Sequence, residues 1–115
     1  MKIKTEKYAS MLLREINDIL YREIYDKDII GTTATYINLA DDLSFARVYC
    51  TVFDETKKEK ALYDLNNAKG FIKGILGKRK LPLKKMPDLE FVYDDSLQYG
   101  EEMDKIIEET IKNDD

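Results

Sequence analysis

The chain has no histidine and a single cysteine among its 115 residues. Histidine is the usual general base near neutral pH, and histidine and cysteine are the usual zinc ligands. The sequence therefore lacks the usual residues for general base catalysis and for a zinc site. One cysteine excludes an internal disulfide and fits a reducing compartment. Neither a Gly-x-Gly-x-x-Gly nor a phosphate-loop motif is present. We therefore expect a protein that is not an enzyme, with no cofactor, no metal and no small-molecule substrate.

The one cysteine, Cys50, lies in an alternating apolar run from Ala46 to Val52. It falls on the same side of that run as Ala46, Val48 and Val52. This pattern favours a small buried core residue over a nucleophile. A small hydrolase would need an activated nucleophile, and the sequence offers none.

Long apolar runs are also missing. The first residues form no apolar signal region, and no stretch approaches the roughly 18 apolar residues that span a bilayer. Hydrophobic residues make up 43% of the chain, with 8 tyrosines and 4 phenylalanines, which is enough for a folded core. We expect one cytoplasmic domain over residues 1–115, with the last few residues frayed and no contact with a membrane.

Charge is distributed unevenly around a formal net value of −4. Residues 1–87 hold 17 basic and 12 acidic side chains, a balance of +5, whereas residues 88–115 hold 2 and 11, a balance of −9. No acidic residue occurs between Lys69 and Lys85, a range that carries seven cations. A concentrated cationic segment of this kind suits phosphate groups, although a solvated basic linker has the same composition.

Hydrophobic spacing predicts the first half of the fold. Apolar residues recur at three- and four-residue steps from Thr5 to Tyr25, which predicts an amphipathic helix. Two segments rich in β-branched residues, Thr32–Leu39 and Leu43–Phe53, are joined by a short turn and predict an antiparallel hairpin.

The second half is predicted to hold two helices, a strand and a last helix. Thr56 and Glu59 have the spacing of a capping box, and Gly70 is expected to break or kink the helix that follows. A second helical piece covers Phe71–Leu76, and Leu89–Tyr93 reads as a strand. Ser96 could cap a last helix with an apolar stripe formed by Tyr99, Met103, Ile106, Ile107, Thr110 and Ile111. The prediction is an α+β fold, a small mixed three-stranded sheet covered on one face by helices.

This order, α-β-β-α-kink-α-β-α, is similar to that of a type II KH domain with one additional C-terminal helix. Three segments, Leu39–Tyr49, Leu65–Lys73 and Pro87–Ser96, resemble motifs of the ribosome-binding factor A family at the right mutual spacing. The resemblance covers roughly residues 8–111.

The resemblance implies a non-enzymatic assembly factor of the cytoplasm that is a monomer when free. Such a factor binds the immature small (30S) ribosomal subunit and its 16S ribosomal RNA, assists late processing of that RNA, and matters most in the cold.

An ordinary KH domain presents Gly-x-x-Gly between its central helices, whereas this chain has Asn67-Ala68-Lys69-Gly70. The family is known for this replacement, so Ala68 and Gly70 form the expected kink motif. Without the usual backbone clamp, RNA affinity should depend more on the cations of the segment. These predicted RNA-binding residues are Lys69, Lys73, Lys78, Arg79, Lys80, Lys84 and Lys85.

Weaker candidates lie elsewhere. Arg14, Arg22 and Arg47 are candidate secondary RNA contacts, and Phe45 and Tyr49 could stack on bases, although packing under a helix is the favoured interpretation. Tyr36 and Tyr99 are expected in the core. The rival function is a protein–protein adaptor whose basic segment binds an acidic partner.

Overall fold

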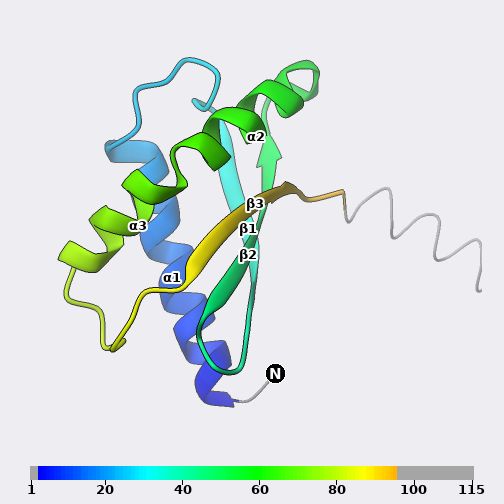
Figure 1. Cartoon of the computed structure of the whole chain (residues 1–115). Helices are drawn as coiled ribbons and strands as arrows, with labels where there is room; N and C mark the ends of the chain where they lie inside the picture. The colour runs from blue at the N-terminus through cyan, green and yellow to red at the C-terminus, as the bar shows by residue number, and fades with distance from the viewer. Residues whose placement is uncertain (1–2, 96–115) are drawn as a thin grey trace, which may run out of the picture.

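The computed structural model describes residues 3–95 of the chain, which form a three-stranded sheet and three α-helices (Figure 1). The elements in chain order are α1 (Ile3–Arg22), β1 (Thr32–Leu39), β2 (Phe45–Val52), the 3₁₀ helix η1 (Glu55–Lys57), α2 (Lys58–Asn67), α3 (Lys69–Lys78) and β3 (Asp88–Tyr93). The predicted last helix and its residue Tyr99 lie outside the described residues.

The sheet has the strand order β1-β2-β3. β1 and β2 form the predicted antiparallel hairpin, with Leu39 opposite Ala46, and an irregularity falls between Ala34 and Tyr36. β3 runs parallel to β2, so the sheet is mixed as expected. The parallel pairing requires a crossover, and α2 and α3 supply it.

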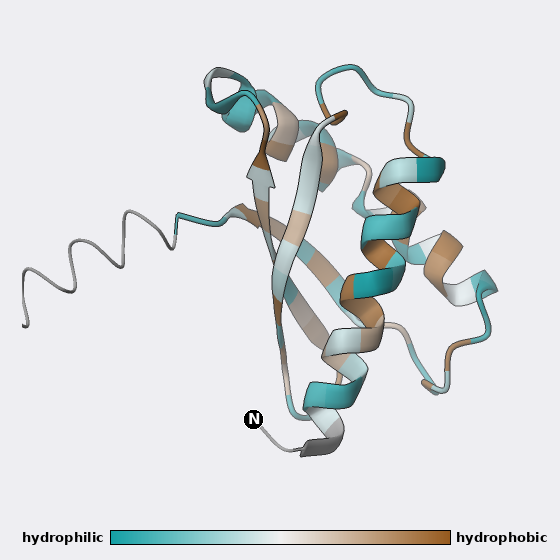
Figure 2. Cartoon of the chain, turned by 180° about the vertical axis from the view of Figure 1, so that it is seen from behind, coloured by the Kyte–Doolittle hydropathy of each residue, from teal (hydrophilic) through white to brown (hydrophobic). Residues whose placement is uncertain are grey.

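The helices pack on one face of the sheet and enclose a single cluster of buried side chains. The predicted apolar stripe of α1 is buried, with Leu12, Ile16 and Ile19 fully inaccessible, and hydrophobic and hydrophilic residues alternate along this helix (Figure 2). Leu65 of α2 and Ile72 of α3 join the same cluster.

Cys50 is fully buried in this cluster, as predicted. Burial, helped by the charge of Asp94, raises the pKa of its thiol to about 12. The thiol therefore stays protonated at neutral pH, and Cys50 is a core residue.

Helix boundaries correct two details of the prediction. α1 ends at Arg22 and does not reach Tyr25. Thr56 does not cap α2: the Asp54 carboxylate accepts from the Thr56 amide and hydroxyl and caps η1, and α2 begins at Lys58 without a side-chain cap. An aspartate two residues upstream offers a charged acceptor to the Thr56 amide and hydroxyl, and it therefore outcompetes the Thr56–Glu59 box.

The open face of the sheet holds aromatic residues that were expected beneath helices. Tyr36, predicted as core, is 52% exposed, and its ring lies 5.7 Å from that of Tyr49 across the hairpin. Phe45 is also exposed and shares this face. The expectation of Tyr36 in the core was therefore wrong, and none of the described helices covers Phe45 and Tyr49, because those helices pack on the opposite face, where Ala46 and Val48 point.

Both edge strands are held by one asparagine each. Asn17 of α1 donates to the Ala34 carbonyl at 2.9 Å and accepts from its amide at 2.7 Å. Asn66 of α2 makes the same pair of bonds with Phe91 of β3, both at 2.9 Å. A side-chain amide thus satisfies a backbone donor and acceptor that would otherwise be unpaired at each sheet edge.

Candidate nucleic-acid interface

The predicted kink lies at Ala68, the residue between α2 and α3. Its backbone has φ −93 and ψ 2, outside the helical region, and the Ile72 amide donates to its carbonyl to begin α3. Gly70 falls inside the first turn of α3, and so the break precedes this glycine. A side chain at Gly70 would meet no atom within 4 Å, which leaves the backbone here open to solvent.

The seven cations of the basic segment divide into two groups by their surroundings. α3, the segment that follows it and the start of β3 lie on the same side of the molecule (Figure 1), and the seven cations come from α3 and that segment. Five of them are exposed and form no ion pair with the described residues: Lys69, Lys78, Lys80, Lys84 and Lys85. The other two, Lys73 and Arg79, are partly buried and ion-paired.

Lys73 is bound to Asp88 at the start of β3. Its ammonium donates to the Asp88 carboxylate at 2.6 Å. This bond lowers the pKa of Asp88, and the charges of Lys85 and Lys69 lower it further. Three lysines therefore gather around one carboxylate, which stays ionised throughout the neutral range. Lys73 is available to a phosphate only if the phosphate displaces Asp88.

Arg79 lies at the end of α3 and connects it to α1. Its guanidinium donates to Glu15 at 2.8 Å and to Asp18 at 2.7 Å. The bond from Arg79 is the main reason why the pKa of Asp18 falls below its ordinary value, and the two acids in turn raise the pKa of Arg79. The charge of Arg79 is thus already neutralised by these two acids.

A groove of about 560 Å³ opens beside the kink. Its walls come from the start of α3, with Lys69, Gly70 and Lys73, and from the facing ends of β2 and β3, with Phe45 and Asp88. The groove combines the ammonium groups of Lys69 and Lys73, the ring of Phe45 and an accessible helix N-terminus with the carboxylates of Asp88 and Glu90. A phosphate next to a base fits there if it displaces Asp88 from Lys73.

The turn after α3 places another lysine in a costly conformation. Lys80 has φ 55, in the left-handed region where glycine is preferred and where other residues lose roughly 1–2 kcal/mol. This turn leads the chain away from α3, and Leu81 and Leu83 then pack against the core. The two leucines hold the segment in place while the lysines before and after them face solvent.

The three secondary candidates do not join this surface equally. Arg22 pairs with Asp18 one turn earlier in α1, at 2.8 Å. Arg47 lies on the open sheet face, 3.5 Å from Glu90. Arg14 is exposed near the middle of α1. None of the three lines the groove beside the kink.

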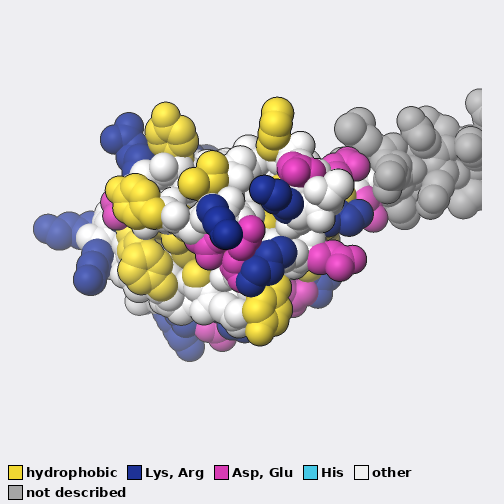
Figure 3. All heavy atoms as spheres, turned by 90° about the horizontal axis from the view of Figure 1, so that it is seen from above, with side chains coloured by type: hydrophobic (Ala, Val, Ile, Leu, Met, Phe, Trp, Pro, Cys, Tyr) yellow, Lys and Arg dark blue, Asp and Glu magenta, His cyan; other side chains and the backbone are white. Residues whose placement is uncertain are grey.

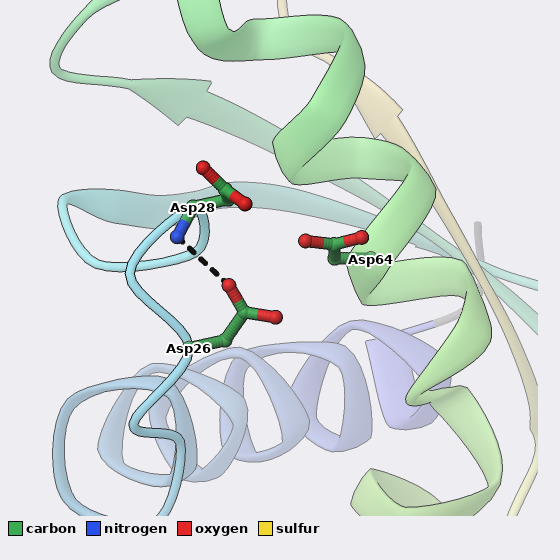
Figure 4. A group of neighbouring side chains, drawn as sticks. All are labelled: Asp26, Asp28 and Asp64. Carbon is green, nitrogen blue, oxygen red and sulfur yellow. Dashed lines mark hydrogen bonds between the residues drawn. The ribbon is translucent and has the colours of Figure 1, made fainter.

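A separate group of carboxylates comes from the loop after α1 and from α2. Asp26, Asp28 and Asp64 point toward one another (Figure 4), with carboxylate oxygens within 4.8 Å. Lys60 donates to Asp64 at 2.9 Å, and this bond, with the charges of all three aspartates, raises the pKa of Lys60. The ammonium group of Lys60 therefore supplies positive charge to this group of carboxylates.

These residues define a small α+β protein with helices on one face of a three-stranded sheet and exposed lysines beside a helix break. No described helix is long and apolar enough to cross a membrane.

Comparisons with known proteins agree on one family. The family model for ribosome-binding factor A matches residues 4–107. Ribosome-binding factor A of Streptococcus pneumoniae (strain G54) is 38% identical over 112 residues, which are 96% of each chain. The chain belongs to the ribosome-binding factor A family.

Solved structures show the same fold. The crystal structure of ribosome-binding factor A from Thermus thermophilus matches with a TM-score of 0.69 and 25% identity, over 77% of this chain and 94% of the other. A Thermus thermophilus ribosome-binding factor A model fitted into a cryo-EM map of its complex with the 30S subunit matches with a TM-score of 0.62 and 26% identity. That match covers 73% of this chain and 88% of the other.

Proposed function

We propose that this protein is a maturation factor of the small ribosomal subunit that binds 16S ribosomal RNA through the basic side of its kinked helix pair. In this proposal the fold acts as a type II KH domain whose usual glycine clamp is replaced by the break at Ala68. The protein works in the cytoplasm on immature 30S particles and assists late processing of their RNA, with its greatest effect in the cold.

One observation carries the proposal: five lysines of α3 and the segment after it are exposed and lack a carboxylate partner among the described residues. An exposed cation without an ion-pair partner in the protein can neutralise an RNA phosphate. The counterions that were condensed on the RNA are then released, and this release drives binding. The family membership and the relative in complex with the 30S subunit agree with this partner.

The rival adaptor function makes a different prediction about the partner. An acidic protein would also be attracted by these lysines. The groove beside the kink supports RNA, because the ring of Phe45 lies near Lys69, whose ammonium has no ion-pair partner among the described residues, and such a pair suits a nucleotide.

The test reverses three exposed lysines in the full chain, Lys78→Glu, Lys80→Glu and Lys84→Glu. We expect binding to purified immature 30S particles and to 16S RNA to fall by at least about tenfold at physiological salt. Sedimentation measures the first and filter binding the second. Arg79 is left intact, because reversing it would break its bonds with Glu15 and Asp18.

The control carries the same charge change away from the basic side, Lys7→Glu, Lys27→Glu and Lys57→Glu. It should retain RNA binding to within a few fold, since a mere change in net charge acts only weakly across the molecule at physiological salt. Equal losses in the two triple variants, or full RNA binding by the first, would remove the basis of the proposal.

A further inference from the structure

The end of the molecule formed by the C-terminus of α1, the loop before β1 and the residue after β2 exposes four large hydrophobic side chains. Tyr21, Tyr25 and Phe53 are 86%, 85% and 95% exposed, and Ile30 is 66% exposed. We call these four residues the apolar end. Figure 3 views the molecule from above and shows exposed hydrophobic side chains among charged ones. A contiguous exposed patch of this kind marks an interaction site more often than a free surface.

The four side chains belong to one continuous surface. A groove of about 1130 Å³ contains Tyr21, Tyr25 and Ile30, and a second groove of about 720 Å³ contains Ile30 and Phe53. The two grooves share Ile30 and Gly31. The Phe53 amide donates to the Gly31 carbonyl at 3.0 Å, so the backbone fixes this junction.

The charge around the apolar end is opposite to that of the basic side. Four carboxylates line the two grooves, those of Glu23, Asp28, Asp54 and Glu55, against the cations Arg22, Lys27 and Lys57. Arg22 is already paired with Asp18. Asp26 and Asp64 stand beside Asp28 (Figure 4) and add two negative charges, of which that of Asp64 is paired with Lys60.

One of the carboxylates at this end, that of Asp54, is held in its ionised form by hydrogen bonds. Hydrogen bonds from the Thr56 hydroxyl and amide hold the pKa of Asp54 below its ordinary value. A polyanion would be repelled here, whereas an arginine or lysine would meet carboxylates and the faces of exposed tyrosines.

We propose that the apolar end is a docking surface for a cationic protein segment in which arginine or lysine alternates with apolar side chains. The proposal rests on the proposed function for the source of that segment, which is a protein of the small subunit. Proteins that bind RNA carry excess positive charge, as the segment requires. The protein then has two working ends, one for RNA and one for protein. A second copy of this chain is a poorer occupant, because two such ends would bring like charges together.

The experiment uses the full chain with Tyr21→Ser, Tyr25→Ser and Phe53→Ser combined. All three side chains are exposed, so the fold should persist, which thermal unfolding checks. We expect the affinity for 30S particles to fall at least about tenfold, while the affinity for protein-free 16S RNA stays within about twofold. Unchanged particle binding, or a parallel fall in RNA binding, would overturn the proposal.

A matched pair of single variants controls for hydrophobicity. Phe53→Ser should weaken particle binding, and Tyr63→Ser should not, because Tyr63 is 64% exposed on α2 outside both grooves. Equal effects would count against the docking surface.

A photo-crosslinking residue at position 53, compared with one at position 63, identifies the partner directly. A crosslink to a small-subunit protein from position 53 alone supports the proposal, whereas crosslinks only to RNA, only to a second copy, or to nothing contradict it.

Titration with each purified small-subunit protein separates this question from RNA binding. If the lysine reversals leave RNA binding intact but one such protein still requires the apolar end for its binding, only the proposed function fails. If no protein binds there, this inference fails.

Discussion

Two neighbouring residues at the end of α3, Lys78 and Arg79, have the same charge but differ in their exposure and in their ion pairs. Lys78 is exposed and has no ion-pair partner among the described residues, whereas Arg79 is shared between two acids of α1. A sequence shows both only as members of one basic run. Their contributions to RNA binding and to stability should therefore separate cleanly.

Neutralising each residue in turn tests this difference. Lys78→Gln should make the log–log salt slope of RNA binding shallower by up to about 0.9 and leave thermal stability unchanged. Arg79→Gln should leave the slope unchanged and lower the melting temperature by up to about 5 °C, because it removes a partly buried ion-pair network. Salt titration and thermal unfolding of the two variants measure both quantities. A shallower slope in Arg79→Gln would show that RNA competes for this guanidinium.

The helices are attached to the sheet through specific polar contacts as well as through the apolar core. Asn66 donates to the carbonyls of Phe91 and Leu62 and accepts from the Phe91 amide. It thereby fixes α2, and the break that follows two residues later, against β3. The position of the lysines beside the kink depends on this attachment.

Asn66→Asp should destabilise the protein by about 1–3 kcal/mol. A carboxylate can still accept from the Phe91 amide, but it cannot donate, and it places a negative charge against two carbonyl oxygens. Asn67→Asp is the matched control, because Asn67 is the exposed next residue at the same helix end. It should cost about 0.5 kcal/mol or less. Urea unfolding of both variants measures the difference, and equal midpoints would mean that the Asn66 bonds contribute little.

Secondary structure was predictable here because each element carries its own periodic signal. β1 has the predicted bounds, and β2 and β3 differ by one or two residues at their ends. The errors fall where a tertiary contact or a competing local hydrogen bond determines the structure. Asp54 takes the Thr56 hydroxyl, and the sheet face opposite the helices leaves Tyr36 exposed. The roles of Asn17 and Asn66 could not be predicted, since nothing local in the sequence says which backbone groups lie at a sheet edge.

At the scale of the whole molecule, the prediction located the basic side but not its available members. Arg79 is separated in sequence from its two partners by 64 and 61 residues, and Lys73 is separated from Asp88 by 15. Only the fold brings these charges together, so a count of cations in the sequence overstates how many are available to phosphates. The apolar end was missed for a related reason, since its four residues lie in three separate segments.

The number of available cations can be counted in solution. With five exposed lysines engaged, the log–log salt slope for 16S RNA should be roughly −3.5 to −4.5, depending on how much of the site is single-stranded. Asp88→Asn removes the carboxylate that is paired with Lys73, so Lys73 should become available as a sixth cation. The slope should steepen by about 0.7–0.9, and affinity at low salt should rise several-fold.

Asp64→Asn is the control for this last prediction, because it releases Lys60 on α2 in the same way. Neither Asp64 nor Lys60 lines the groove beside the kink, so this release should change neither slope nor affinity appreciably. If Asp88→Asn and Asp64→Asn behave alike, the gain would be a general loss of negative charge. A gain confined to Asp88→Asn would place the phosphate at Lys73, in the groove where α3 begins.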